Sequence, residues 1–96
     1  YQMNKREVNY QLLKSATSIG ANVREAQNAK SKADFIHKMK IAHKEADETV
    51  YWLELCAAAK NYPSNKELQG KIEVIIKILS KIIGTTKTKV KTQVYN

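Results

Sequence analysis

The residue types that usually carry catalysis or hold metal ions are sparse in this chain of 96 residues. Its two histidines, His37 and His43, are six positions apart, so a helix would point them in different directions, away from a shared metal ion. Asp34 precedes His37 by three positions, but a metal site in a helical bundle needs further acids from other helices. The sequence shows no Ser-His-Asp set, glycine-rich phosphate loop or nucleophile elbow. We therefore expect no metal, no cofactor and no enzymatic activity.

The single cysteine, Cys56, has only Lys60 as a basic neighbour at helical spacing. A reactive thiol needs nearby positive charge, so we interpret Cys56 as a buried structural residue. One cysteine also excludes an intramolecular disulfide framework and suits a reducing compartment. Because no apolar run approaches the roughly 18 residues of a spanning helix and no signal peptide is visible, we expect a cytoplasmic protein without membrane association.

Strong positive charge is the remaining chemical feature. Seventeen Lys and Arg residues face nine acids, which gives a net charge of +8. Residues 45–59 carry four acids and no base, so the surplus lies before and after them. A surplus of this size favours anionic partners such as RNA, DNA or an acidic membrane surface, although it also serves solubility.

The lysines gather around the start of a central helix, where His37 and His43 lie between them, and again near the C-terminal end. Lysine ammonium groups neutralise phosphates without reading base sequence. Aromatic side chains for base stacking are few here, which argues against single-strand recognition by stacked bases. We predict nucleic-acid contacts at Lys30, Lys32, Lys38, Lys40, Lys44, Lys87 and Lys89.

The central helix is predicted from Lys32 to about Lys60. This stretch has no Gly or Pro, and a Ser31-Lys32-Ala33-Asp34 capping box precedes it. Its apolar residues recur in steps of three and four, the pattern of a helix that packs against other helices. The predicted seam is Phe35, Met39, Ala42, Ala46, Thr49, Leu53 and Cys56.

A second apolar group on the same helix points roughly away from this seam, so the helix is expected to be contacted from two sides. One side would be its own bundle, and the other a further helix or another subunit. We predict an oligomer interface at Ile41, Trp52 and Leu55.

An earlier helix is predicted over about residues 7–30, with its seam at Val8, Leu12, Ala16, Ile19, Val23 and Ala26. Its middle, Ser15 to Ala21, is nearly all small, and two interpretations compete. Ser18 caps a new helix after a break, or one helix runs through and its small side chains admit a neighbouring backbone. The uninterrupted apolar period favours the second interpretation, under which Gly20→Ala would be destabilising.

A third helix is predicted over about residues 65–84. Ser64-Asn65-Lys66-Glu67 forms a capping box and Gly84 is a plausible C-cap. A helical bundle domain at 1–86 is then followed by a basic tail at 87–96, which we expect to be helical at first and frayed or extended later. Three helices joined by short turns should pack antiparallel. The third seam is Leu68, Ile72, Ile75, Leu79 and Ile82, broadened by Ile76 and Ile83.

The chain has a family resemblance that rests on two stretches of sequence. They are QLLKSATSIGANVREA over residues 11–26 and SKADFIHKMKIAHKEADETVYWLEL over residues 31–55. The chain resembles the four-helix-bundle proteins encoded in intervening sequences of bacterial 23S ribosomal RNA genes. The resemblance implies a continuous helix through Ser15–Ala21, a ring that is typically a homopentamer, and no enzymatic activity. It also implies a full helix before residue 11, to whose end only residues 1 to about 6 could belong.

The resemblance suggests two functions. One is nucleic-acid binding through the basic surface. The other follows from a related group, the accessory proteins of diversity-generating retroelements, which bind a reverse transcriptase and its RNA. We predict an all-α, antiparallel up-down helical bundle, non-enzymatic and homo-oligomeric, with RNA or other nucleic acid as its partner. The rival hypothesis is a protein-interaction scaffold that docks a partner enzyme.

Overall fold

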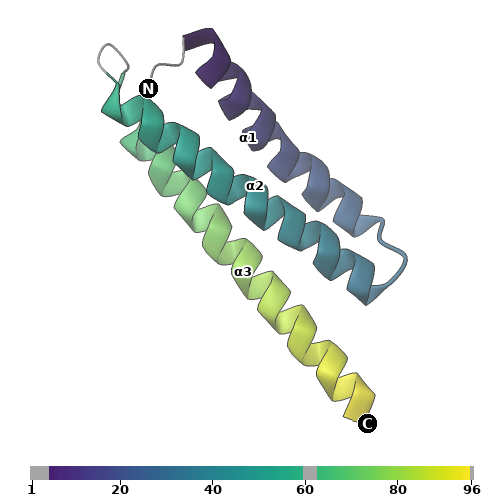
Figure 1. The fold of residues 1–96 in the computed structure, drawn as a ribbon. Helices are drawn as coiled ribbons and strands as arrows, with labels where there is room; N and C mark the ends of the chain where they lie inside the picture. Colours follow the sequence, from purple (N-terminus) through teal and green to yellow (C-terminus); the bar gives the residue numbers. More distant parts are fainter. Residues whose placement is uncertain (1–4, 60–62, 96) are drawn as a thin grey trace.

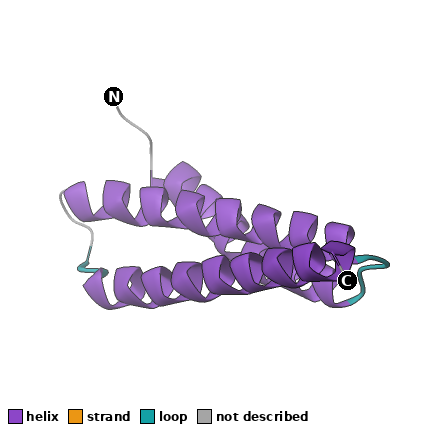
Figure 2. Ribbon diagram, turned by 90° about the horizontal axis from the view of Figure 1, so that it is seen from below, coloured by secondary structure: helices purple, strands orange, loops and turns teal. Residues whose placement is uncertain are grey.

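The computed structural model describes residues 5–59 and 63–95, with side chains to residue 88, and it is all-α over these ranges (Figure 1). Helix α1 spans Lys5–Gln27, α2 spans Lys32–Ala58 and α3 spans Lys66–Tyr95. The three lie lengthwise beside one another, and the molecule measures 57 × 21 × 21 Å (Figures 1 and 2). The predicted helical bundle is therefore confirmed, with three helices in the described chain.

Helix α2 is the centre of the bundle, because both α1 and α3 pack along it (Figure 1). Its predicted seam is confirmed almost completely. Phe35 is partly buried against the core, and Ala42 and Ala46 are fully buried at 0% exposure. The buried residues of α2 are Met39, Ala42, Ala46, Thr49, Leu53 and Cys56.

The other two helices complete one hydrophobic core around α2. Ile19 and Ala26 enter it from α1, and Leu79 enters it from α3. Half of the predicted α1 seam is buried, and half of it is only half-buried: Val8, Ile19 and Ala26 are buried, and Leu12, Ala16 and Val23 are half-buried. The structure also buries Ser15, which the prediction did not include. Ser15 is accommodated because its hydroxyl lies 3.0 Å from the buried hydroxyl of Thr49 on α2. A polar pair therefore forms part of the α1–α2 contact.

Helix α1 runs without a break through its small residues, so the continuous helix that the sequence favoured is confirmed. The close packing of a neighbouring backbone that was expected at this stretch is wrong for Gly20. Gly20 is exposed, and a Cβ added there would meet nothing within 4 Å. No neighbouring backbone of the described chain approaches Gly20. The side chains of Thr17 and Ser18 instead bond back to carbonyls of the preceding turn.

The two later helices begin differently. The Ser31 side chain accepts a hydrogen bond from the Asp34 amide at 3.0 Å, which confirms the predicted cap of α2. Helix α3 begins at Lys66, and the carbonyl of Asn65 accepts its first helical bond, from the Gln69 amide. The Asn65 side-chain amide donates to the Leu53 carbonyl at 2.9 Å, so it ties the start of α3 to the end of α2.

Helix α3 is longer than predicted, because it continues through Gly84 to Tyr95. The prediction of a C-cap at Gly84 is wrong, and the stretch that was expected to be a tail is helical to Tyr95. A glycine lowers helix propensity by about 1 kcal/mol, which alone does not end a helix whose neighbours favour continuation. The hydroxyls of Thr86 and Thr88 donate to the carbonyls of Ile82 and Gly84 one turn earlier, as helical threonines commonly do.

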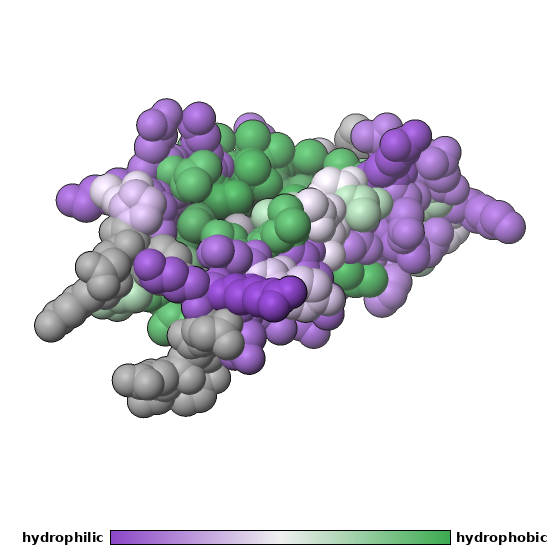
Figure 3. Space-filling view, turned by 90° about the horizontal axis from the view of Figure 1, so that it is seen from above, coloured by the Kyte–Doolittle hydropathy of each residue, from purple (hydrophilic) through white to green (hydrophobic). Residues whose placement is uncertain are grey.

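Considerable apolar surface remains exposed on this bundle. Figure 3 shows apolar side chains gathered on one face, with hydrophilic side chains toward its two ends. Two members of the predicted α3 seam, Leu68 and Ile82, are exposed rather than buried. None of the described helices is both long and apolar enough to cross a membrane. The exposed large apolar residues are Tyr10, Leu13, Tyr51, Leu68, Val74, Ile78 and Ile82.

The residues predicted at an oligomer interface are not the most exposed ones. Ile41, Trp52 and Leu55 are all half-buried within the single chain. The Trp52 indole also donates a long hydrogen bond of 3.4 Å to Glu48, and its ring meets Tyr51 edge-on. Their role in a subunit contact stays a prediction.

Candidate nucleic-acid interface

A basic hollow lies between α2 and α3. It has a volume of about 370 Å³. Helix α2 contributes Lys40 and His43, which are three positions apart and so share one side of the helix. Helix α3 contributes its other members at a spacing of three and four. We call it the α2–α3 hollow and define it by Lys40, His43, Ser80, Ile83, Gly84 and Lys87.

His43 links the two helices at the edge of this hollow. Its Nε2 atom lies 3.0 Å from Ser80 Oγ, and its Nδ1 atom lies 3.4 Å from an Asp47 carboxylate oxygen. With the proton on Nδ1, beside the Asp47 carboxylate, Nε2 of the neutral ring accepts a hydrogen bond from the Ser80 hydroxyl. Asp47 thereby fixes the direction in which the imidazole faces α3.

The statement that the chain holds no Ser-His-Asp set is therefore wrong, because folding places Asp47, His43 and Ser80 in one row. Acyl transfer also requires an oxyanion hole, and the described residues place none beside this row. Ser80 lies inside α3, where the backbone amides are used in helical bonds and so do not form an oxyanion hole. The Asp47 side chain is 60% exposed, so the dry surroundings that strengthen such a row are missing too. We interpret the row as a polar contact between helices.

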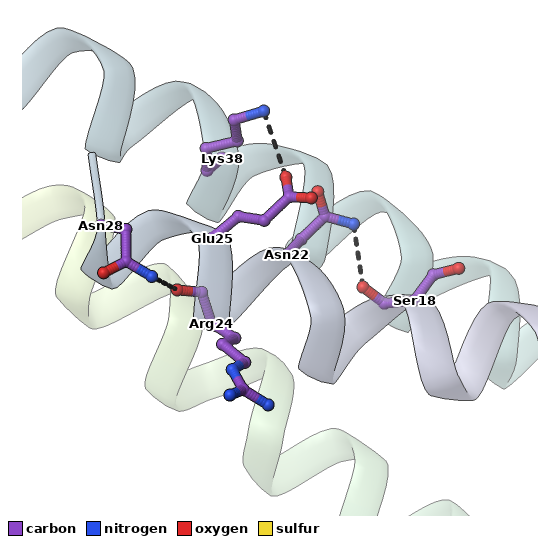
Figure 4. Close-up of polar contacts among 6 residues, drawn as sticks. All are labelled: Ser18, Asn22, Arg24, Glu25, Asn28 and Lys38. Carbon is purple, nitrogen blue, oxygen red and sulfur yellow. Dashed lines mark hydrogen bonds and ion pairs between the residues drawn. The ribbon is translucent and has the colours of Figure 1, made fainter. Parts of the chain in front are cut away.

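The lysine cluster expected from the sequence is divided by the structure. Lys40 and Lys44 are one turn apart on α2 and both are exposed. Lys38 lies on the other side of the helix, where its ammonium group is 3.2 Å from the Glu25 carboxylate of α1 (Figure 4). An internal carboxylate already balances the charge of Lys38, so this lysine contributes less to an anion-binding surface than Lys40 does.

The remaining predicted lysines take three positions. Lys30 is exposed in the turn between α1 and α2, and Lys32 is exposed in the first turn of α2. Lys87 is exposed on α3 and lines the α2–α3 hollow, so the structure brings it together with Lys40 although they are far apart in sequence. The side chain of Lys89 lies outside the described residues.

Sequence reasoning missed Ser80. The bond between His43 and Ser80 joins residues 37 positions apart, and no local pattern in α3 distinguishes Ser80 from any other polar residue. Finding it requires the register of α3 against α2. The spacing of four between His43 and Asp47 was visible in the sequence and indicates half of the row.

Cys56 is buried at the end of α2, as predicted, and burial raises the pKa of its thiol. A raised pKa keeps the thiol protonated, which makes it a poor nucleophile. The described residues contain no group of three or more His, Cys, Asp and Glu placed to hold a metal ion.

Comparison with known proteins assigns the family. The family model described as 23S rRNA-intervening sequence protein matches residues 2–82. The chain belongs to this family. A solved structure is also similar, that of a protein of unknown function from the S23 ribosomal protein family of Bacteroides thetaiotaomicron VPI-5482. The two are 46% identical with a TM-score of 0.76, and the match covers 79% of this chain and 72% of that one. No curated protein matches this chain.

Proposed function

We propose that this 23S rRNA-intervening sequence protein binds RNA through the exposed lysines of α2 and α3, without catalysing a reaction. The observation that supports this proposal best is the convergence of Lys40 and Lys87 from two helices on one hollow. A net charge of +8 adds long-range attraction for a polyanion. The family name links the group to the 23S ribosomal RNA, which makes ribosomal RNA the first partner to test.

The second part of the proposal is assembly into a homo-oligomer of antiparallel four-helix bundles, with a pentameric ring as the expected size. It is supported by the exposed apolar residues, since apolar patches of this kind mark contact surfaces. A ring would repeat the lysines of each subunit, so modest contacts would add up to high avidity. Sedimentation of the unmodified chain should give a mass of several chains. A mass of one chain at micromolar concentration would contradict this part.

RNA binding is tested by the salt dependence of affinity. Each lysine that neutralises a phosphate of single-stranded RNA contributes about −0.7 to the slope of log K against log salt. Lys40→Gln should flatten the slope by about that amount, and equally for 23S ribosomal RNA fragments and unrelated RNA of equal length, because phosphate contacts carry no sequence information. Helix content should barely change, since Gln is nearly as good a helix former as Lys.

Lys38→Gln is the matched control, because it removes the same charge from the same helix. Its partner Glu25 already balances that charge, so Lys38→Gln should leave the slope nearly unchanged. Equal effects of the two variants would mean that only net charge matters. The proposal fails if Lys40→Gln and Lys40→Gln with Lys44→Gln both bind RNA like the wild type, with the wild-type slope.

A second candidate function is a scaffold that docks a partner protein, such as the reverse transcriptase of a diversity-generating retroelement. The exposed apolar stripe of α3, formed by Val74, Ile78 and Ile82 one turn apart, favours it. A scaffold would lose its weak RNA binding near physiological salt. The salt titration therefore separates the two candidates.

A further inference from the structure

Two hollows of similar size lie along α3, and they differ in chemistry. The first, of about 300 Å³, is lined mostly by apolar groups and carries one lysine, Lys81, among Ile78, Ile82, Thr85 and Thr86. The second is the α2–α3 hollow. Ile78 and Ser80 are two positions apart, which is about 200° around a helix, so the hollows open on different sides of α3. Of these two, only the α2–α3 hollow is lined by two lysines together with a histidine and a serine.

We propose that the α2–α3 hollow is a subsite for a single phosphate group, which the RNA backbone supplies. This deepens the proposed function and rests on it for the source of the phosphate. The lysines Lys40 and Lys87 are donors without acceptor atoms, and the Ser80 hydroxyl can turn to donate. Phosphate oxygens only accept, and hydrogen bonds from a cation to them are about twice as strong as neutral ones. No carboxylate stands among the six residues that line the hollow.

His43 is already oriented for this role. Asp47 holds the Nδ1 side of the ring, so Nε2 faces Ser80 and the hollow. When both ring nitrogens carry a proton, Nε2 donates to a phosphate oxygen while Nδ1 stays beside the Asp47 carboxylate. Among the described residues, Asp47 is the acid that contacts the His43 ring, and its negative charge opposes the binding of an anion. Its carboxylate lies on the far nitrogen of the ring and is 60% exposed, so water screens the repulsion.

Gly84 leaves the rim of the hollow open. A Cβ added at Gly84 would meet nothing within 4 Å, so a larger side chain would extend over the hollow without straining α3. Gly84→Leu therefore obstructs the subsite and leaves every charge in place. Gly70 provides a matched control, because it lies in the same helix, is exposed and has equally open surroundings.

The first experiment measures binding of a short single-stranded RNA to the full chain over a salt series. Gly84→Leu should weaken binding by about tenfold, the effect of one charged hydrogen-bonded contact. It should also flatten the salt slope by about 0.7, although the net charge is unchanged. Gly70→Leu should behave like the wild type. If Gly84→Leu keeps the affinity and slope of the wild type, the subsite proposal is wrong. The proposed function is tested separately, by the salt slope of Lys40→Gln.

A second pair of variants keeps the test decisive if Gly84→Leu fails to fold. Lys87→Gln and Lys81→Gln remove the same charge from the same helix, but only Lys87 lines the α2–α3 hollow. Lys87→Gln should flatten the slope by about 0.7 and Lys81→Gln by clearly less. Equal slopes for these two variants would overturn the subsite.

The second experiment identifies the source of the phosphate. Inorganic phosphate is titrated into the protein and backbone amide signals are followed by NMR. The amides of Ser80 and Gly84 should shift, and that of Gly70 should not. Localised shifts in a protein that binds no RNA would support a subsite for a free phosphate compound and would contradict the proposed function. Shifts spread evenly over all lysine-bearing turns would contradict the subsite.

Discussion

The two contacts that α2 makes, with α1 and with α3, contain interhelical hydrogen bonds of the same length in opposite surroundings. Thr49 and Ser15 meet at 3.0 Å between α2 and α1, and both residues are only 2% exposed. His43 and Ser80 meet at 3.0 Å between α2 and α3, where solvent reaches them. Distance alone would rank the two bonds as equal. Burial separates them, because a buried polar group that loses its partner has no water to replace it.

This difference assigns different roles to the two contacts. The α1–α2 contact contains the buried pair Ser15 and Thr49, whose hydroxyls meet out of reach of solvent. The α2–α3 contact is anchored by Leu79 and otherwise uses half-buried isoleucines, so polar groups at its edge remain open to solvent. A bond such as that of His43 can be exchanged for a bond to a ligand at small cost.

The largest expected effect concerns the anchor of α3. Leu79 is 3% exposed, and Leu79→Ala should lower the free energy of unfolding by about 2–5 kcal/mol, because it removes buried methyl groups and leaves a cavity. Urea unfolding of both proteins measures the change. The neighbouring Ile78 is 52% exposed, so Ile78→Ala should change the stability of the single chain by less than about 0.5 kcal/mol. Equal losses would show that the exposed stripe of α3 is buried in solution.

The next effect tests the comparison of the two hydrogen bonds directly. Thr49→Val keeps the shape of the side chain and removes its hydroxyl, so it should cost about 1–3 kcal/mol, because the buried Ser15 oxygen loses the hydrogen bond that it accepts. Ser15 retains a contact of 3.2 Å with the Leu12 carbonyl, which favours the lower part of this range. Ser80→Ala should cost less than about 0.5 kcal/mol, since solvent replaces the lost bond. A larger cost for Ser80→Ala than for Thr49→Val in the same denaturant series would reverse the comparison.

The smallest effect tests whether α1 has only one buried face. Gly20→Ala should raise the free energy of unfolding by about 0.5–1 kcal/mol, because the helix gains propensity and the added methyl group meets open space. Gly70→Ala, at a second open position, should give a similar gain. A loss at Gly20 together with a gain at Gly70 in thermal melts would show that another copy of the chain covers the outer face of α1.

Much of this fold follows from periodicity. The seam of α2 was predicted because a helix repeats its buried face every three or four residues, and six of its seven members are buried. Periodicity does not fix the angle at which a helix presents its stripe, so it placed Ala16 in the core where Ser15 lies. It also treated Ile82 as buried, although the packing of α3 against α2 leaves it exposed.

The candidate site was only half predictable. Lys40 and Lys87 stand out as cations in the sequence, but their meeting depends on the register of α3 against α2, which local patterns do not encode. The same limit hid Ser80. The pairing of Lys38 with Glu25 was hidden for a related reason, since it depends on the side of α2 that α1 occupies. Gly84 was predicted to end α3 because glycine is common at helix C-caps, but the helix continues through it.

Because Cys56 is buried, the rate at which its thiol is labelled reports local opening of the wild-type chain. A thiol reagent reaches Cys56 only when the end of α2 separates from its neighbours, so the rate of labelling reports how often that opening occurs. When reclosing is faster than the reaction, the rate measures the equilibrium population of the open form. With one cysteine in the sequence, the signal has a single origin. Labelling with and without RNA would show whether RNA binding changes how often the end of α2 opens, and the experiment needs no substitution in the protein.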